Sequence, residues 1–217
     1  MVNLYTIDAE HFETQAIKIK KLYYKYRAKT IVIDANGAGV GLVDMMTVSQ
    51  IDPETGDTLP DFGVEGGNYE GADTDYKKLK TPDTEVDAMY LIKANAPLNT
   101  EAHSYVQSQM INGKIKFLID EVQAKTKLMA TKQGQAMDPS QRADYLQPFT
   151  LTTILKEQMM NLTEENEGIN IILKQVTKGI KKDKFSALEY ALYYIKQDDD
   201  RRRRRKKSRI SDFMFFS

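Results

Sequence analysis

An uninterrupted apolar run that ends in an acid constrains this fold more than any other feature of the sequence. Residues 30–34 read Thr-Ile-Val-Ile-Asp, without the alternation of a half-exposed strand. Strands without alternation are buried on both faces, as in parallel sheets. A strand at 2–7 and a helix at 9–28 are expected before the run, and a short helix after the glycine-rich turn 35–41. Strands and helices in alternation indicate an α/β layer architecture.

Residues 52–87 interrupt this alternation. The stretch holds eleven acids, three lysines and three prolines, with few large apolar side chains. Such a composition cannot bury enough surface to offset its ordering entropy, which predicts a long mobile insertion. After it we expect strands at 89–95, 114–119 and 169–176. We expect helices at 99–112, 151–162 and 183–197, a polar helix that ends near residue 131, a loop at 132–148 and a turn at 164–168.

Charge is unevenly distributed along the chain. The 31 basic and 31 acidic side chains cancel, but residues 198–217 carry eight basic and four acidic groups. We therefore predict one domain over residues 1–197, with an acidic excess, and a basic disordered tail over 198–217. For this tail a solvated terminus, contact with DNA phosphates and docking to an acidic partner surface are all open. Its basic run consists of Arg201, Arg202, Arg203, Arg204, Arg205, Lys206 and Lys207.

Residues that the chain lacks exclude several classes of protein. It has no cysteine, and therefore no disulfide, thiolate nucleophile or cysteine zinc site. No apolar run reaches the length of a membrane span and no signal peptide is recognisable, which makes the cytosol the expected compartment. Zinc-protease and serine-hydrolase motifs are absent as well. His11 and His103 lack ligand spacing with acids and are expected to be surface or core residues.

The glycines at 37, 39 and 41 allow two interpretations. They match neither the Walker pattern nor the dinucleotide pattern, because no lysine follows them and residue 42 is leucine. We therefore expect a tight strand-to-helix turn that lets the following helix pack closely. Nucleotide binding is the weaker alternative.

Two aspartates are the candidates for chemistry. Asp34 ends the apolar run, and functional groups in α/β sheets gather beyond the carboxyl ends of strands. Asp183 lies at the expected start of a late helix. Either carboxylate could instead cap a helix. If they are functional, carboxylates favour chemistry assisted by hard cations such as Mg²⁺ or Mn²⁺.

Together, two motifs resemble the nuclease domain of large terminase subunits from tailed bacteriophages. They are IVIDANGAGVGLVD at 31–44 and KKDKFSALEYALYYI at 181–195. Segments at 93–95, 102–121 and 151–162 are similar to that family too, so the resemblance covers most of residues 1–197. It implies an RNase H-like fold, in which helices flank a mixed sheet. It also implies a two-metal endonuclease that cuts concatemeric viral DNA during genome packaging.

The resemblance assigns roles to individual residues. It implies that Asp34 and Asp183 are catalytic and coordinate a pair of Mg²⁺ or Mn²⁺ ions. Asp44, in the first motif, would contact the metal ligands without binding the metal itself, or would be a plain helix surface position. The implied partners are double-stranded viral DNA, the terminase ATPase segment, the small terminase subunit and the portal. The implied location is the host cell cytoplasm, without a membrane.

Two parts of the family pattern are missing. The first metal-binding aspartate and the two opening strands would fall upstream of Met1, and no ATPase domain with its Walker motif is present. Without the opening strand, residues 30–34 would form an exposed apolar sheet edge. We therefore expect a piece of a split or truncated terminase that needs another segment to complete sheet and site. The alternative is a non-catalytic fragment that binds DNA or the portal.

Overall fold

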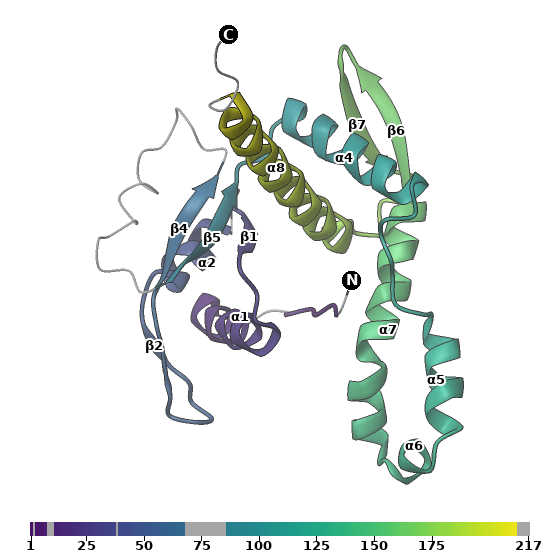
Figure 1. Ribbon diagram of the computed structural model, residues 1–217. Helices are drawn as coiled ribbons and strands as arrows, with labels where there is room; N and C mark the ends of the chain where they lie inside the picture. Colours follow the sequence, from purple (N-terminus) through teal and green to yellow (C-terminus); the bar gives the residue numbers. More distant parts are fainter. Residues whose placement is uncertain (2, 8–10, 38, 68–85, 212–217) are drawn as a thin grey trace. The chain divides into compact units, whose positions relative to one another are not determined.

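The computed structural model shows two compact units, which we describe separately (Figure 1). It describes all residues except 2, 8–10, 38, 68–85 and 212–217. Unit 1 comprises residues 1–6 and 99–189, and unit 2 comprises residues 7–98 and 190–217. The fold is mixed α/β, with small sheets flanked by helices. This division differs from the single domain expected over 1–197.

Three parallel strands form the main sheet of unit 2. β1 (Ile31–Asp34) pairs with β5 (Val86–Ile92), which pairs on its other side with β4 (Phe62–Gly67). Ile31 lies opposite Met89 in this register. The prediction of a parallel sheet from the apolar run is therefore confirmed, as is a strand within 89–95. β1 is an edge strand, because within the described ranges no strand pairs with its other side.

Helices α1 (Phe12–Tyr26) and α2 (Gly39–Met46) pack on this sheet. Ala16 of α1 and Met46 of α2 are fully buried in one cluster with Phe62 of β4. Ile19 and Tyr23 extend the apolar stripe of α1 against the same cluster. The amphipathic helix expected from the three- and four-residue spacing is therefore present over the described part of 9–28.

The expected mobile insertion at 52–87 is wrong for residues 52–67 and 86–87. These residues belong to β4, β5 and a small hairpin of β2 (Gln50–Ile51) and β3 (Thr58–Leu59), and 68–85 lie outside the described residues. Asp52 is buried and forms an ion pair of 2.8 Å with Lys21 of α1. The hydrogen bond from Lys21 lowers the pKa of the Asp52 carboxyl. The acidic composition predicted disorder, but Asp52 is neutralised by a lysine on a helix that lies far away in the sequence.

Unit 1 consists of helices and one antiparallel hairpin. Its helices are α4 (Ala96–Ile111), α5 (Glu121–Met129), α6 (Lys132–Ala136), α7 (Pro139–Met160) and the first turns of α8 (Asp183–Ser211). The hairpin joins β6 (Leu162–Glu167) to β7 (Asn170–Gln175). The predicted helices at 99–112, up to about 131 and at 151–162 are confirmed, as is the strand at 169–176. The predicted turn at 164–168 begins later than expected, because residues 164–167 belong to β6 and the turn lies at Gly168 and Ile169.

The predicted loop at 132–148 is also wrong, since α6 and most of the first half of α7 occupy it. The carboxylate of Asp138 accepts the N–H of Gln141 at 2.9 Å, and the Gln141 side chain accepts the N–H of Asp138 at 3.2 Å. This capping box starts α7, and Pro139 sits at a first-turn position that favours proline. Proline here marks the beginning of a helix instead of a loop.

Two predicted strands do not form. Residues 3–7 and 114–119 have neither helical nor strand structure, although the N-terminal amine donates a hydrogen bond of 2.8 Å to the carbonyl of Lys116. Both runs have β-forming composition, but side-chain pairing with a neighbouring strand, not composition, stabilises a strand.

The predicted disordered tail differs from the structure over residues 198–211, which continue helix α8. Within α8, Arg202 pairs with Asp198 at 2.6 Å and Lys196 pairs with Asp200 at 3.3 Å, both one turn apart. Such pairs and the good helix propensity of arginine support a solvated helix. The expected boundary at residue 197 therefore lies inside a continuous helix.

Candidate functional site

Asp34 stands at the carboxyl end of β1 with its side chain exposed. Its neighbours Ile33 and Ala35 are buried in the core of unit 2, so the strand alternation directs Asp34 away from that core. The Asp34 Oδ1 accepts the N–H of Asn36 at 3.1 Å, which closes a local turn. The residue thus presents a carboxylate at the end of a parallel strand.

Glycine at position 39 lets α2 begin directly beside this carboxyl end. A Cβ at Gly39 would lie 1.7 Å from the carbonyl oxygen of Asp34, and one at Gly41 would lie 2.5 Å from the Phe12 ring. The first contact is with backbone and excludes a side chain, whereas the second would require the Phe12 ring to move. The expectation of a tight turn with a closely packed helix is therefore confirmed.

Asp183 is exposed at the first position of α8, in unit 1. The helix N–H groups of Lys184 and Phe185 donate to Oε1 of Gln158, at 3.0 and 3.2 Å. Gln158 is a buried residue of α7, so a distant side chain does the capping that we considered for Asp183. The carboxylate of Asp183 remains at the surface, beside the positive end of the helix dipole.

Asp44 is an exposed residue of α2. Its backbone carbonyl accepts a hydrogen bond of 2.8 Å from Thr47 Oγ1. This environment fits the plain helix surface position that was one of the two expectations for Asp44.

Asp34 and Asp44 lie in unit 2 and Asp183 lies in unit 1. Among the described residues, no three histidine, aspartate or glutamate side chains come together as a metal-binding group. The exposed carboxylates of Asp34 and Asp183 are nevertheless the oxygen donors that Mg²⁺ and Mn²⁺ prefer.

The basic run forms an exposed helical surface at Arg201–Arg205. The Arg201 guanidinium carbon lies 5.9 Å from the ring centres of Tyr90 and Tyr194, which places a cation against two aromatic rings. Residues Lys206 and Lys207 follow on the same helical backbone. At least the start of the basic run is therefore helical, where the sequence predicted a disordered tail.

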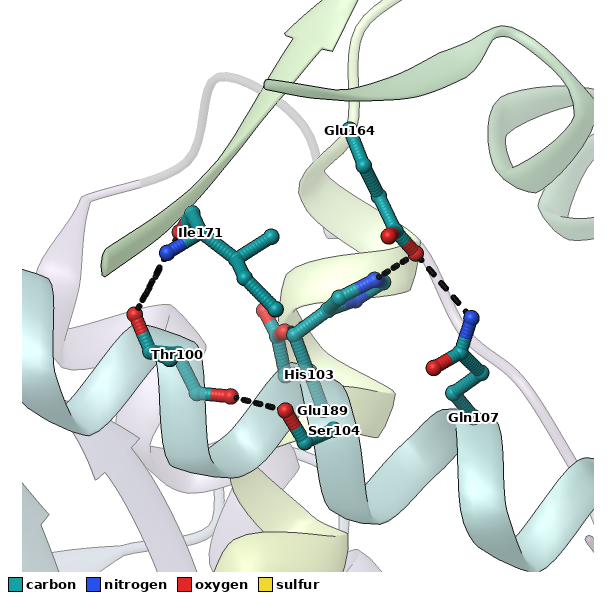
Figure 2. A network of polar contacts seen from close by, with 7 residues as sticks. All are labelled: Thr100, His103, Ser104, Gln107, Glu164, Ile171 and Glu189. Carbon is teal, nitrogen blue, oxygen red and sulfur yellow. Dashed lines mark hydrogen bonds and ion pairs between the residues drawn. The ribbon is translucent and has the colours of Figure 1, made fainter. Parts of the chain in front are cut away.

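A polar network in unit 1 was missed by the sequence reasoning (Figure 2). Nε2 of His103 on α4 lies 2.8 Å from Oε1 of Glu164 on β6, and Gln107 donates to the same oxygen at 3.2 Å. Nδ1 of His103 lies 3.8 Å from Oε1 of Glu189 on α8. His103 is mostly buried, as one of the two expectations had it. Nothing in the local sequence indicated its partners, because Glu164 is 61 residues away.

Burial raises the pKa of Glu189 to about 7, and the charge of Lys182 opposes that shift. Glu189 is 6% exposed. Its pKa is displaced mainly because a charged carboxylate loses its hydration inside the protein.

Comparisons of the chain with family models, with curated proteins and with solved structures gave no match. Within the part of the chain that the structure describes, no helix combines the length and the apolar character required to cross a membrane.

Proposed function

We propose that this chain is the nuclease segment of a large terminase subunit, which cuts concatemeric viral DNA during packaging by two-metal hydrolysis. The observation that carries the proposal is the exposed Asp34 carboxylate at the carboxyl end of a parallel strand. This is the position where α/β sheets collect functional groups. The resemblance of residues 31–44 and 181–195 to the family adds the reaction class.

In this proposal Asp34 and Asp183 hold the metal ions. The metal pair supplies the activation of a water molecule and the stabilisation of the leaving 3′ oxygen. The protein contributes the positions of the ligands. Asn36 orients the Asp34 carboxylate through its backbone N–H, and Gln158 caps α8 so that Asp183 is spared that task.

The proposal includes an RNase H-like sheet that another segment completes. Support comes from β1, whose second edge has no partner strand among the described residues. Ile31 and Val32 on this strand are only half-buried, and β1 carries neither lysine nor proline, which commonly protect an exposed edge. An added strand would pair with β1 and bring the remaining metal ligand.

The test is cleavage of linear double-stranded DNA with Mn²⁺ by the full chain together with the terminase ATPase segment, which in this proposal completes the sheet and the metal site. We expect Asp34→Asn and Asp183→Asn each to abolish cleavage, since the amide removes a charged ligand. Asp144→Asn is the matched control, because Asp144 is also an exposed aspartate, on α7. Cleavage that survives either of the first two substitutions would contradict the proposed site.

A second candidate is a fragment that binds DNA or the portal without catalysis. The exposed helical cations at Arg201–Arg205 favour it. If all five contact DNA phosphates, the logarithm of affinity should fall with that of salt concentration with a slope near −4 to −5. Salt-dependent binding without any cleavage, unchanged by Asp34→Asn, would support this candidate against the nuclease.

A further inference from the structure

Two buried polar atoms face each other in unit 1 without a hydrogen bond. Nδ1 of His103 and Oε1 of Glu189 are 3.8 Å apart, and within the described part of the chain neither has a hydrogen-bond partner. A buried polar atom without a partner destabilises the fold. The arrangement therefore needs an explanation that the nuclease proposal does not provide.

A single proton resolves the conflict. Nε2 of His103 is engaged with the Glu164 carboxylate, where a ring N–H donates best. With no further proton, the lone pair of Nδ1 would face the charged oxygen of Glu189. A proton on either atom turns this repulsion into an attraction, as imidazolium to carboxylate or as carboxylic acid to imidazole.

We propose that His103 and Glu189 share one proton in the folded chain and form a pH-sensitive latch between α4 and the start of α8. While the proton is present, the pair holds the two helices together. When the pair loses it, the repulsion between the two buried lone pairs weakens the attachment of the first turns of α8. This inference goes beyond the proposed nuclease and does not depend on it.

The surroundings of the pair support this behaviour. Among the described residues, the charged groups next to the pair are Glu164 of β6, whose Oε1 lies 2.8 Å from Nε2 of His103, and Lys182 before α8, whose charge disfavours a proton on Glu189. Burial raises the pKa of Glu189 to about 7, so the proton is lost around neutral pH. The ring centres of Phe185 and His103 are 6.2 Å apart in an edge-to-face arrangement. This contact links the latch to the first turn of α8.

Hydrogen exchange on the full chain tests the latch at the backbone N–H of Ser186, which bonds the Lys182 carbonyl at 2.9 Å. After correction for intrinsic rates, protection should fall as the pH rises from about 4.5 to about 7, by up to tenfold per pH unit, the limit for one proton, and should stay constant above that range. In Glu189→Gln the amide donates to Nδ1 at every pH, and protection should stay constant. Constant protection in the wild type, or an equal fall in Glu189→Gln, would overturn the proposal.

Glu165→Gln is the matched control. Glu165 is a neighbouring carboxylate on β6 that pairs with Lys174 and does not face His103, so this variant should keep the wild-type fall. If Glu189→Gln does not fold, the ¹³C shift of the Glu189 carboxyl in the wild type decides the matter. A titration midpoint near 7 for this carboxyl supports the shared proton. A midpoint near the ordinary 4.5 overturns it.

Discussion

Replacing Gly39 by alanine should destabilise unit 2, because the first turn of α2 touches the backbone of Asp34. The new Cβ would lie 1.7 Å from the Asp34 carbonyl oxygen, and both partners are backbone, so no side-chain rotation can relieve the clash. The helix must move by more than about 1 Å, a change of the overpacking kind that costs about 1–3 kcal/mol or more. Alanine gains back about 0.5–1 kcal/mol as the better helix former. We expect a net loss of about 2 kcal/mol.

Hydrogen exchange at the N–H of Ala35 is a suitable assay, since this group bonds the Ile92 carbonyl at 2.8 Å beside the altered contact. A loss of about 2 kcal/mol corresponds to exchange that is faster by about 30-fold. Urea unfolding followed by tyrosine fluorescence gives a global measure, because the chain has twelve tyrosines and no tryptophan. If the variant carries out the proposed reaction, its cleavage rate should fall as Asp34 is displaced.

Two other glycines of the same turn provide controls. Gly37 has a φ of +54° and open space around it, so Gly37→Asn, which tolerates that backbone, should cost less than about 0.5 kcal/mol. Gly41→Ala meets the end of the Phe12 side chain at 2.5 Å, which can move, and should cost less than Gly39→Ala. Stability of Gly39→Ala within about 0.5 kcal/mol of the wild type would refute the close-packing argument.

Two further substitutions test buried polar groups. Gln158→Leu removes the acceptor for the N–H groups of Lys184 and Phe185 and should lower the unfolding free energy by about 1–3 kcal/mol. The measurement is hydrogen exchange of the Phe185 amide, which should become faster. Gln158→Glu keeps an acceptor and should retain most of the protection. Lys20 is fully buried, and burial lowers its pKa from 10.5 to about 8, so the folded state binds its proton less tightly than the unfolded state does. The unfolding free energy of the wild type should therefore rise relative to that of Lys20→Met between about pH 8 and 10.5, by up to about 3 kcal/mol, in denaturation curves measured across that range. If the unfolding free energies of the two proteins run parallel with pH, burial does not lower the pKa of Lys20. The variant also loses the hydrogen bond from Lys20 to the Val48 carbonyl, which lowers its unfolding free energy by the same amount at every pH.

Local patterns predicted the centre of unit 2 well. The strand at 31–34 and the turn into α2 depend on an apolar run and on glycines that are neighbours in the chain. The strand at 89–95 also followed from its apolar composition, but the expected burial of residues 30–34 on both faces did not hold, because among the described residues β1 is an edge strand with Ile31 and Val32 only half-buried. The acid that ends the run, Asp34, could be selected as a candidate from sequence alone, because functional groups in α/β sheets gather beyond the carboxyl ends of strands.

The predictions of secondary structure were wrong where a segment is stabilised by residues far away in the chain. The composition of residues 52–67 predicted a mobile segment. In the structure Asp52 forms an ion pair with Lys21, and Phe62 is buried in the core. Residues 114–119 have strand-like composition but no strand structure, because propensity without a paired neighbour does not make a strand. The helical continuation of α8 is supported by charge pairs one turn apart, which the prediction of a disordered tail did not consider.

The sequence by itself determined the α/β class, the parallel strand that carries Asp34 and the helix that begins at Asp183. Only the tertiary structure decided which side chains act on these positions. Gln158 caps α8 from 26 residues away, and Glu164 reaches His103 across 61 residues. The physical reason is range: hydrophobic periodicity and turn chemistry are local properties of the chain, whereas capping by a distant side chain and a shared buried proton exist only after folding has brought separate segments into contact.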